Sequence, residues 1–71
     1  MNPDPSTLKS GQAIQITGFG QAQATLKKKN RDYCLVYGTR VRWGNLIQIR
    51  EDIAFFERYG HLPPQHLPFW H

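Results

Sequence analysis

Short segments in which apolar and polar residues alternate, separated by glycines, restrict the fold of this chain more than any other feature. Residues 14–17 read Ile-Gln-Ile-Thr, and residues 21–27 read Gln-Ala-Gln-Ala-Thr-Leu-Lys. Successive side chains of a β-strand point to opposite faces, so this period is typical of strands with one buried and one polar face. Gly18 and Gly20 separate the two segments. The pattern therefore predicts an antiparallel hairpin that turns at these glycines.

The segments that follow extend this hairpin to a sheet. Residues 33–37 read Tyr-Cys-Leu-Val-Tyr and are apolar on both faces, which predicts a central strand covered on both sides. Residues 40–43 alternate strictly, and residues 46–50 return as a further strand after a two-residue loop at positions 44–45. The sequence thus predicts a mainly β fold, with a small five-stranded antiparallel sheet or partly closed barrel at the scale of SH3-like barrels.

The spacing of apolar residues changes after these strands. Asp52 is a suitable N-cap, and Ile53, Phe56 and Tyr59 follow at intervals of three residues, which is typical of an apolar helix face. Gly60 stands where a left-handed C-terminal cap is expected. We therefore predict one short C-terminal helix from Asp52 to Tyr59. Because so short a helix is unstable alone, it has to dock on the sheet.

A chain of 71 residues is too short for two independent cores, so we expect one domain. Residues 1–10 are polar and predict a flexible N-terminal tail. Residues 11–60 form the predicted β domain, and residues 61–71, in which His-Leu-Pro occurs twice, predict an extended C-terminal tail. The predicted core consists of Ile14, Ile16, Ala24, Leu26, Cys34, Leu35, Val36, Val41, Trp43, Ile47, Ile49, Ile53 and Phe56.

The composition indicates a cytoplasmic protein. Cys34 is the only cysteine, so the chain cannot form an internal disulfide, which favours a reducing compartment. No apolar run reaches the roughly 20 residues that a membrane-spanning helix requires. Residues 1–6 lack the basic and apolar regions of a signal peptide. We therefore expect no membrane partner.

Positive charge is concentrated in the middle of the chain. The whole chain has a net charge of +4, whereas residues 20–50 hold seven basic residues and one acidic residue, Asp32. Lysine and arginine neutralise phosphates, and aromatic rings stack on bases. The sequence therefore favours a non-enzymatic module that binds nucleic acid. The predicted contacts are Lys27, Lys28, Lys29, Arg31, Arg40 and Arg42 for phosphates, with Tyr33 or Tyr37 as a stacking group.

A purely structural explanation of the same residues stays open. The lysines at 27–29 could serve only to solubilise a hairpin tip, and the nearby aromatic residues could belong to the core. Trp43 in particular is expected in the core, because it falls on the strand face opposite Arg40 and Arg42.

The alternative function is a small adaptor in a larger complex. Its basic face would dock on an acidic protein, and an exposed sheet edge and the C-terminal tail would add contacts. The apolar anchors in that tail are Leu62, Leu67, Phe69 and Trp70. The competing explanation is that the tail folds back and completes a core that the strands cannot fill. Self-association is a further option.

The candidate catalytic and metal groups do not form a set. His61, His66 and His71 occur at intervals of five residues. Extended chain of that length can separate neighbouring histidines by up to about 17 Å, too far for a shared metal without a sharp turn. Cys34 alternates with Val36 and is expected as an inert buried thiol. The sequence offers no nucleophile together with a base and an orienting group. We therefore expect no enzymatic activity, no metal and no cofactor.

Overall fold

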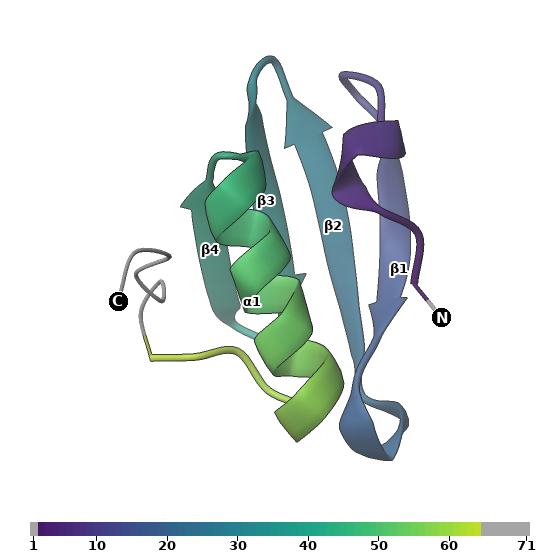
Figure 1. Cartoon of the computed structure of the whole chain (residues 1–71), viewed down its shortest axis with the longest axis vertical. Helices are drawn as coiled ribbons and strands as arrows, with labels where there is room; N and C mark the ends of the chain where they lie inside the picture. The colour runs from purple at the N-terminus through teal and green to yellow at the C-terminus, as the bar shows by residue number, and fades with distance from the viewer. Residues whose placement is uncertain (1, 65–71) are drawn as a thin grey trace.

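The computed structural model describes residues 2–64. In this part of the chain, a four-stranded antiparallel sheet in the order β1-β2-β3-β4 packs against one C-terminal helix, α1 (Figure 1). The elements are η1 (Pro5–Thr7), β1 (Ala13–Thr17), η2 (Phe19–Gln21), β2 (Gln23–Lys29), β3 (Asp32–Tyr37), β4 (Arg40–Gly44) and α1 (Leu46–Tyr59). The mainly β architecture with a C-terminal helix, and the hairpin through Gly18 and Gly20, are confirmed.

The prediction of a fifth strand over residues 46–50 was wrong, because these residues form the first turns of α1. Asn45 is the N-cap of the helix. Its side-chain oxygen accepts a hydrogen bond from the backbone amide of Gln48 at 2.9 Å, and the Gln48 side chain accepts one from the Asn45 amide at 3.3 Å. This capping box satisfies two amides that the start of a helix would leave unpaired. Asp52, predicted as the cap, lies inside the helix and is fully buried.

The sheet is open rather than closed into a barrel. Strands β1 and β4 lie at opposite edges of the four-stranded order and do not pair with each other within residues 2–64. The predicted barrel depended on a fifth strand to bring the edges together. Because residues 46–50 are helical, the fold has two layers, with α1 and η1 on the same side of the sheet (Figure 1).

The core lies between α1 and one face of the sheet. The strand register places Leu26 opposite both Ile14 and Leu35, and residues directly opposite share a face. The helix contributes Ile49, Ile53 and Phe56 to the same core. The buried cluster consists of Leu8, Ile16, Ala24, Leu26, Tyr33, Leu35, Ile49, Ile53, Phe56 and Leu62.

Three residues of the predicted core lie at the surface. Val41, Trp43 and Ile47 are 46%, 54% and 47% exposed. Side chains alternate between the two faces of β4 as predicted. However, Arg40 and Arg42 face the helix side of the sheet, and Val41 and Trp43 face away from it. Ile47 is exposed because it belongs to the helix and points away from the sheet. Of the other predicted core residues, Ile14 and Val36 are half-buried, and the remainder are buried.

Both segments that the sequence predicts as tails contain buried residues. Pro5 and Leu8 precede β1 and are buried against the rest of the fold. After the helix, Leu62 is 2% exposed and belongs to the core cluster. A small domain of this kind needs such additional cover for its core. Leu67, Phe69 and Trp70 lie outside the described residues.

The end of α1 packs closely on the β1–β2 connection. A Cβ atom at Gly18 would lie 2.5 Å from the carbonyl oxygen of Phe56, so no larger residue fits there. Gly60 adopts the predicted left-handed cap with φ of 77°, and its amide donates to the Phe56 carbonyl at 2.7 Å.

Candidate nucleic-acid interface

The face of the sheet that α1 does not cover carries a row of four residues, one from each strand. The register pairs Ala13 with Lys27, Lys27 with Cys34, and Cys34 with Trp43. Paired residues share a face, and the neighbouring positions Leu26 and Leu35 are fully buried beneath the helix. The row therefore lies on the side of the sheet away from α1.

A groove of about 500 Å³ runs along this row. Trp43, 54% exposed, and the nearly buried Cys34 supply its apolar surface. Val41, 46% exposed, lies two positions before Trp43 on the same face of β4. The complete lining is Gly11, Gln12, Ala13, Lys27, Lys28, Lys29, Cys34 and Trp43. An exposed indole on the same face as Lys27 and Lys29 is the most distinctive chemical feature of the described surface.

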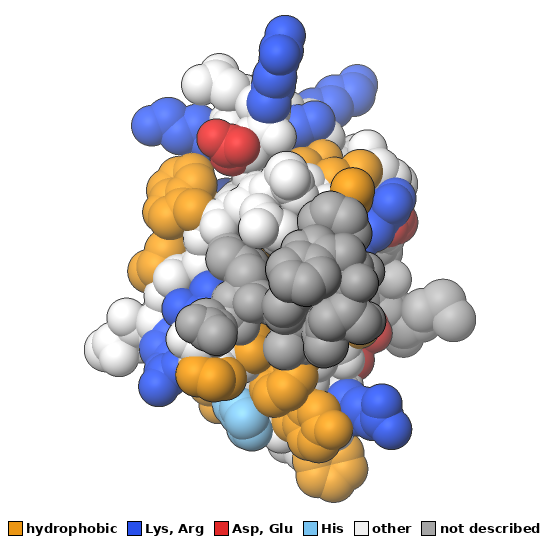
Figure 2. Space-filling model, turned by 60° about the vertical axis from the view of Figure 1, so that its left-hand side comes forward, with side chains coloured by type: hydrophobic (Ala, Val, Ile, Leu, Met, Phe, Trp, Pro, Cys, Tyr) orange, Lys and Arg blue, Asp and Glu red, His pale blue; other side chains and the backbone are white. Residues whose placement is uncertain are grey.

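The basic side chains gather at the end of the sheet that carries the β2–β3 turn. Lys27 and Lys29 are exposed on β2, and Arg31 is exposed in the turn itself. Asn30 adopts a positive φ of 57°, which allows the tight connection, and its amide donates to the Ser10 hydroxyl at 3.2 Å. Lys and Arg side chains project from the top of the molecule in Figure 2, the same end at which the β2–β3 turn lies in Figure 1.

The two tyrosines predicted as stacking groups face the helix side of the sheet. Tyr33 is 4% exposed, and the Lys28 ammonium lies 5.4 Å from the centre of its ring. Tyr37 is half-buried and packs edge-on against Phe56, with the ring centres 5.1 Å apart. Trp43, which the sequence assigns to the core, is the aromatic residue that borders the lysines at the surface.

Arg40 and Arg42 are not brought together with the lysines. They lie on the helix side of edge strand β4, because the register pairs them with Tyr37 and Leu35. The Arg42 guanidinium donates a hydrogen bond to the Pro63 carbonyl, which holds the segment after α1 against the sheet edge. Arg40 is exposed and lines a separate pocket beside His61. The predicted constellation is therefore divided between two sites.

Cys34 is the free thiol at the floor of the groove. Burial raises the pKa of this thiol, and the neighbouring Lys27 ammonium offsets the effect only in part. The thiolate is the nucleophilic form of cysteine, so this environment disfavours nucleophilic chemistry. Cys34 therefore acts as a small apolar surface beside Trp43.

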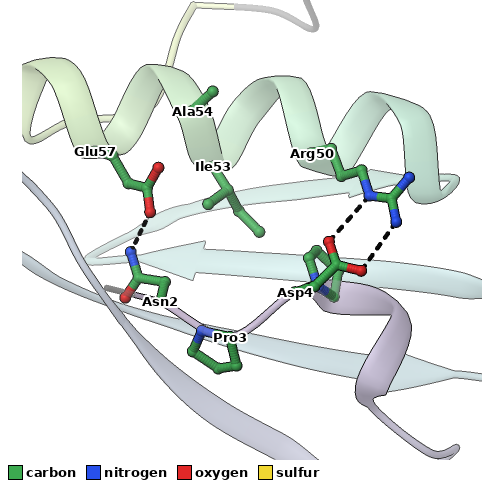
Figure 3. Close-up of a pocket in the computed structure, with 8 residues that line it drawn as sticks. Asn2, Pro3, Asp4, Arg50, Ile53, Ala54 and Glu57 are labelled. Carbon is green, nitrogen blue, oxygen red and sulfur yellow. Dashed lines mark hydrogen bonds and ion pairs between the residues drawn. The ribbon is translucent and has the colours of Figure 1, made fainter.

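A second pocket, of about 230 Å³, lies between the N-terminal segment and α1 (Figure 3). Its polar groups bind one another. Arg50 donates two hydrogen bonds to the Asp4 carboxylate, at 3.1 and 2.9 Å, and the Asn2 side-chain amide donates to Glu57 at 2.7 Å. Hydrogen bonds from Arg50 and then from Ser6 lower the pKa of Asp4 to about 2. These contacts fasten the N-terminus to the helix and leave little polar surface for a ligand.

Within residues 2–64, no group of three or more His, Cys, Asp or Glu side chains is arranged to hold a metal ion. In the same range, no helix has the length and apolar character needed to cross a membrane. Comparison with known proteins finds no matching family model, no similar curated protein and no similar solved structure.

Proposed function

We propose that this protein is a non-enzymatic nucleic-acid-binding module whose basic end contacts phosphates. The observation that carries the proposal is the gathering of Lys27, Lys29 and Arg31, all exposed, around one turn. An ion pair joins Asp4 of the N-terminal segment to Arg50 of α1, and no ion pair links Lys27, Lys29 or Arg31 to another described residue. The charges at the basic end are therefore available to an external anion.

A polyanion is the ligand that this arrangement favours. Exposed lysines gain little from isolated surface ion pairs, whereas a nucleic acid releases condensed counterions at every phosphate that is neutralised. Four cationic side chains at this end, Lys27, Lys28, Lys29 and Arg31, correspond to about four phosphate contacts. With that number, affinity for a single strand should fall about 50-fold between roughly 50 and 200 mM salt.

Charge reversal at the basic end tests the proposal. We expect the double variant Lys27→Glu and Lys29→Glu to lose more than about tenfold in affinity for labelled oligonucleotides at roughly 50 mM salt. The matched control reverses Arg40 and Arg58, which changes the net charge equally and places the new charges away from the basic end. Fluorescence anisotropy over a salt series measures both variants.

The control decides between a localised site and net charge alone. Equal losses in the two double variants would mean that total charge, rather than the basic end, governs binding. Absence of any complex at low salt would remove the proposal. Melting curves of each variant show whether a loss of binding reflects a loss of folding.

The adaptor alternative has its own supporting observation. At the bottom of Figure 2, hydrophobic side chains gather beside a histidine. Phe19 and Tyr59 are 70% and 50% exposed, and the Phe55 and Tyr59 rings lie 4.5 Å apart beside His61. Exposed aromatic residues are common among the energetically dominant residues of protein interfaces.

A pull-down with nuclease treatment separates the two functions. A protein partner retained after nuclease, and lost in a Phe19→Ala, Tyr59→Ala variant, would favour the adaptor. The C-terminal anchors are tested in the full chain with the triple variant Leu67→Ala, Phe69→Ala, Trp70→Ala. Leu62 is left intact in this experiment, because it is part of the protein's own core.

A further inference from the structure

We infer that Trp43, which is exposed on the sheet face opposite α1, is a stacking platform for an unpaired base, so that the ligand of the basic end is single-stranded nucleic acid. This inference rests on the proposed function and names its substrate class. It is carried by the shared groove, in which the exposed indole of Trp43 and the side chains of Lys27 and Lys29 line the same surface.

The sheet holds the indole in a position that a base can reach. Trp43 belongs to β4, an edge strand, and its backbone is fixed by pairing with Cys34 on β3. The nearly buried Cys34 and the exposed Val41 give the surface around the indole an apolar character. Stacking on an aromatic ring stabilises a bound strand by about 1–3 kcal/mol per base and tolerates any sequence, because every base has a π-face.

The lysines lie at a suitable distance from that ring. Lys27 and Trp43 occupy the same row with β3 between them, so their backbones are roughly 10 Å apart. The long, flexible lysine side chain can reach from this position toward a phosphate while the attached base lies on the indole. Lys29 continues the positive charge along β2 toward the turn at Arg31.

Charge argues for a polyanion rather than a second copy of the chain. A symmetric face-to-face dimer through this groove would bring the lysines at 27 and 29 close to those of the partner copy. Like charges opposed in this way cost free energy, whereas a nucleic acid supplies the complementary charge. An acidic peptide would supply charge but lacks the regular array of planar groups that a tryptophan platform recognises.

The same geometry favours an unpaired strand over a duplex. Bases in a duplex are already stacked and paired, and their faces are not available to an aromatic side chain outside the helix. A duplex would therefore gain only the phosphate contacts. We expect the protein to prefer a single strand over a duplex of the same length at equal salt.

The test uses the full-length protein and oligothymidine of about 12 nucleotides, a length within the range that small β domains cover. We expect Trp43→Ala to weaken this complex about 5- to 150-fold, the loss of one stacked base, while duplex binding changes little. Trp43→Phe should retain part of the affinity. Phe19→Ala is the matched control, because it removes an exposed aromatic residue at the other end of the molecule.

Fluorescence gives a second readout. In a Trp70→Phe background, Trp43 is the only indole in the chain, and oligothymidine should quench its emission. Oligonucleotide binding that depends on Lys27 and Lys29 but not on Trp43 would overturn the stacking inference and leave the proposed function intact. No oligonucleotide binding at all would overturn both.

Two other results would also count against the inference. If Trp43 emission shifts with protein concentration alone, and Trp43→Ala abolishes a dimer in light scattering, the face is a self-association surface. If polyglutamate competes as well as oligothymidine at equal charge, the groove recognises acidic chains in general.

Discussion

Asp4 and Arg50 show how a single pair of side chains can contribute to the acid sensitivity of the fold. The carboxylate has a pKa of about 2 in the folded protein, below its ordinary value of 3.8, because Arg50 and then Ser6 donate hydrogen bonds to it. A depressed carboxyl pKa contributes stability that is present above the ordinary pKa. That contribution is lost as the pH falls through the folded value.

We therefore predict that Asp4→Asn lowers the melting temperature at neutral pH, and that the difference from wild type shrinks between about pH 4 and pH 2. Asparagine keeps an oxygen that can accept from the Ser6 amide, so the variant isolates the charge. Thermal unfolding across this pH range measures the difference. A difference that stays constant down to pH 2 would contradict the role assigned to the ion pair, and added salt should reduce it.

Residue identity alone could not place Trp43. The alternation in β4 predicts a strand, but period two does not say which face is buried, and apolar character favours Val41 and Trp43 for the core. In the structure the half-buried Arg42 faces the helix side, with its guanidinium bound to the Pro63 carbonyl. Arginine can bury its aliphatic stem when its charged end finds an acceptor.

At the scale of elements, the sequence at the start of α1 is compatible with both a strand and a helix. In the Leu-Ile-Gln-Ile-Arg segment, residues 47–50 alternate between apolar and polar, which is compatible with a strand. The longer pattern favours a helix, because Leu46, Ile49, Ile53 and Phe56 recur at intervals of three and four and face the core. Asn45 followed by Gln48 is a capping signal that identifies the helix start from sequence alone.

The cap is expected to contribute measurably to stability. We predict that Asn45→Ala lowers the free energy of unfolding by about 1 kcal/mol, because it leaves a helix amide without its acceptor. Asn45→Asp is the matched control and should retain stability, since a carboxylate also accepts the bond and complements the helix dipole. Urea denaturation measures both. No change on alanine substitution would mean that the helix start is held by packing alone.

A correct prediction of the helix over residues 46–59 would also have indicated which face of the sheet holds the candidate site. Within residues 2–64, α1 is the only α-helix, and it packs on one face of the sheet, so no described helix covers the other face. The pattern in β3 points the other way, because it is apolar on both faces, yet only Tyr33 and Leu35 face the core and Cys34 and Val36 face away from α1. The lysine cluster is visible in the sequence, whereas its association with Trp43 depends on strand register across β3.

At the scale of the whole molecule, the core extends beyond the strands and the helix. Leu62, on the segment after α1, is 2% exposed and packs in the same cluster as Leu26 and Phe56. We predict that Leu62→Ala lowers the free energy of unfolding by about 2–5 kcal/mol, as truncation of a buried leucine does. That is a large share of the total for so small a domain.

The matched control for Leu62 is Val41→Ala, which truncates an aliphatic side chain that is 46% exposed. It should cost less than about 1 kcal/mol. Denaturant unfolding of the two variants compares the sites directly. Similar small effects would mean that the segment after α1 does not contribute to the core in solution.

The linear order of the strands has a consequence for synthesis on the ribosome. Each strand pairs with the one made just before it. Strands β1 to β4 can therefore form three successive hairpins from contacts that are local in the sequence. The layer that covers them is made last, because α1 begins only at Leu46 and Leu62 follows later still. A nascent chain that ends at β4 therefore presents Leu26 and Leu35 to solvent, a state prone to aggregation. Completion of the helix is the step that converts this exposed sheet into a folded protein.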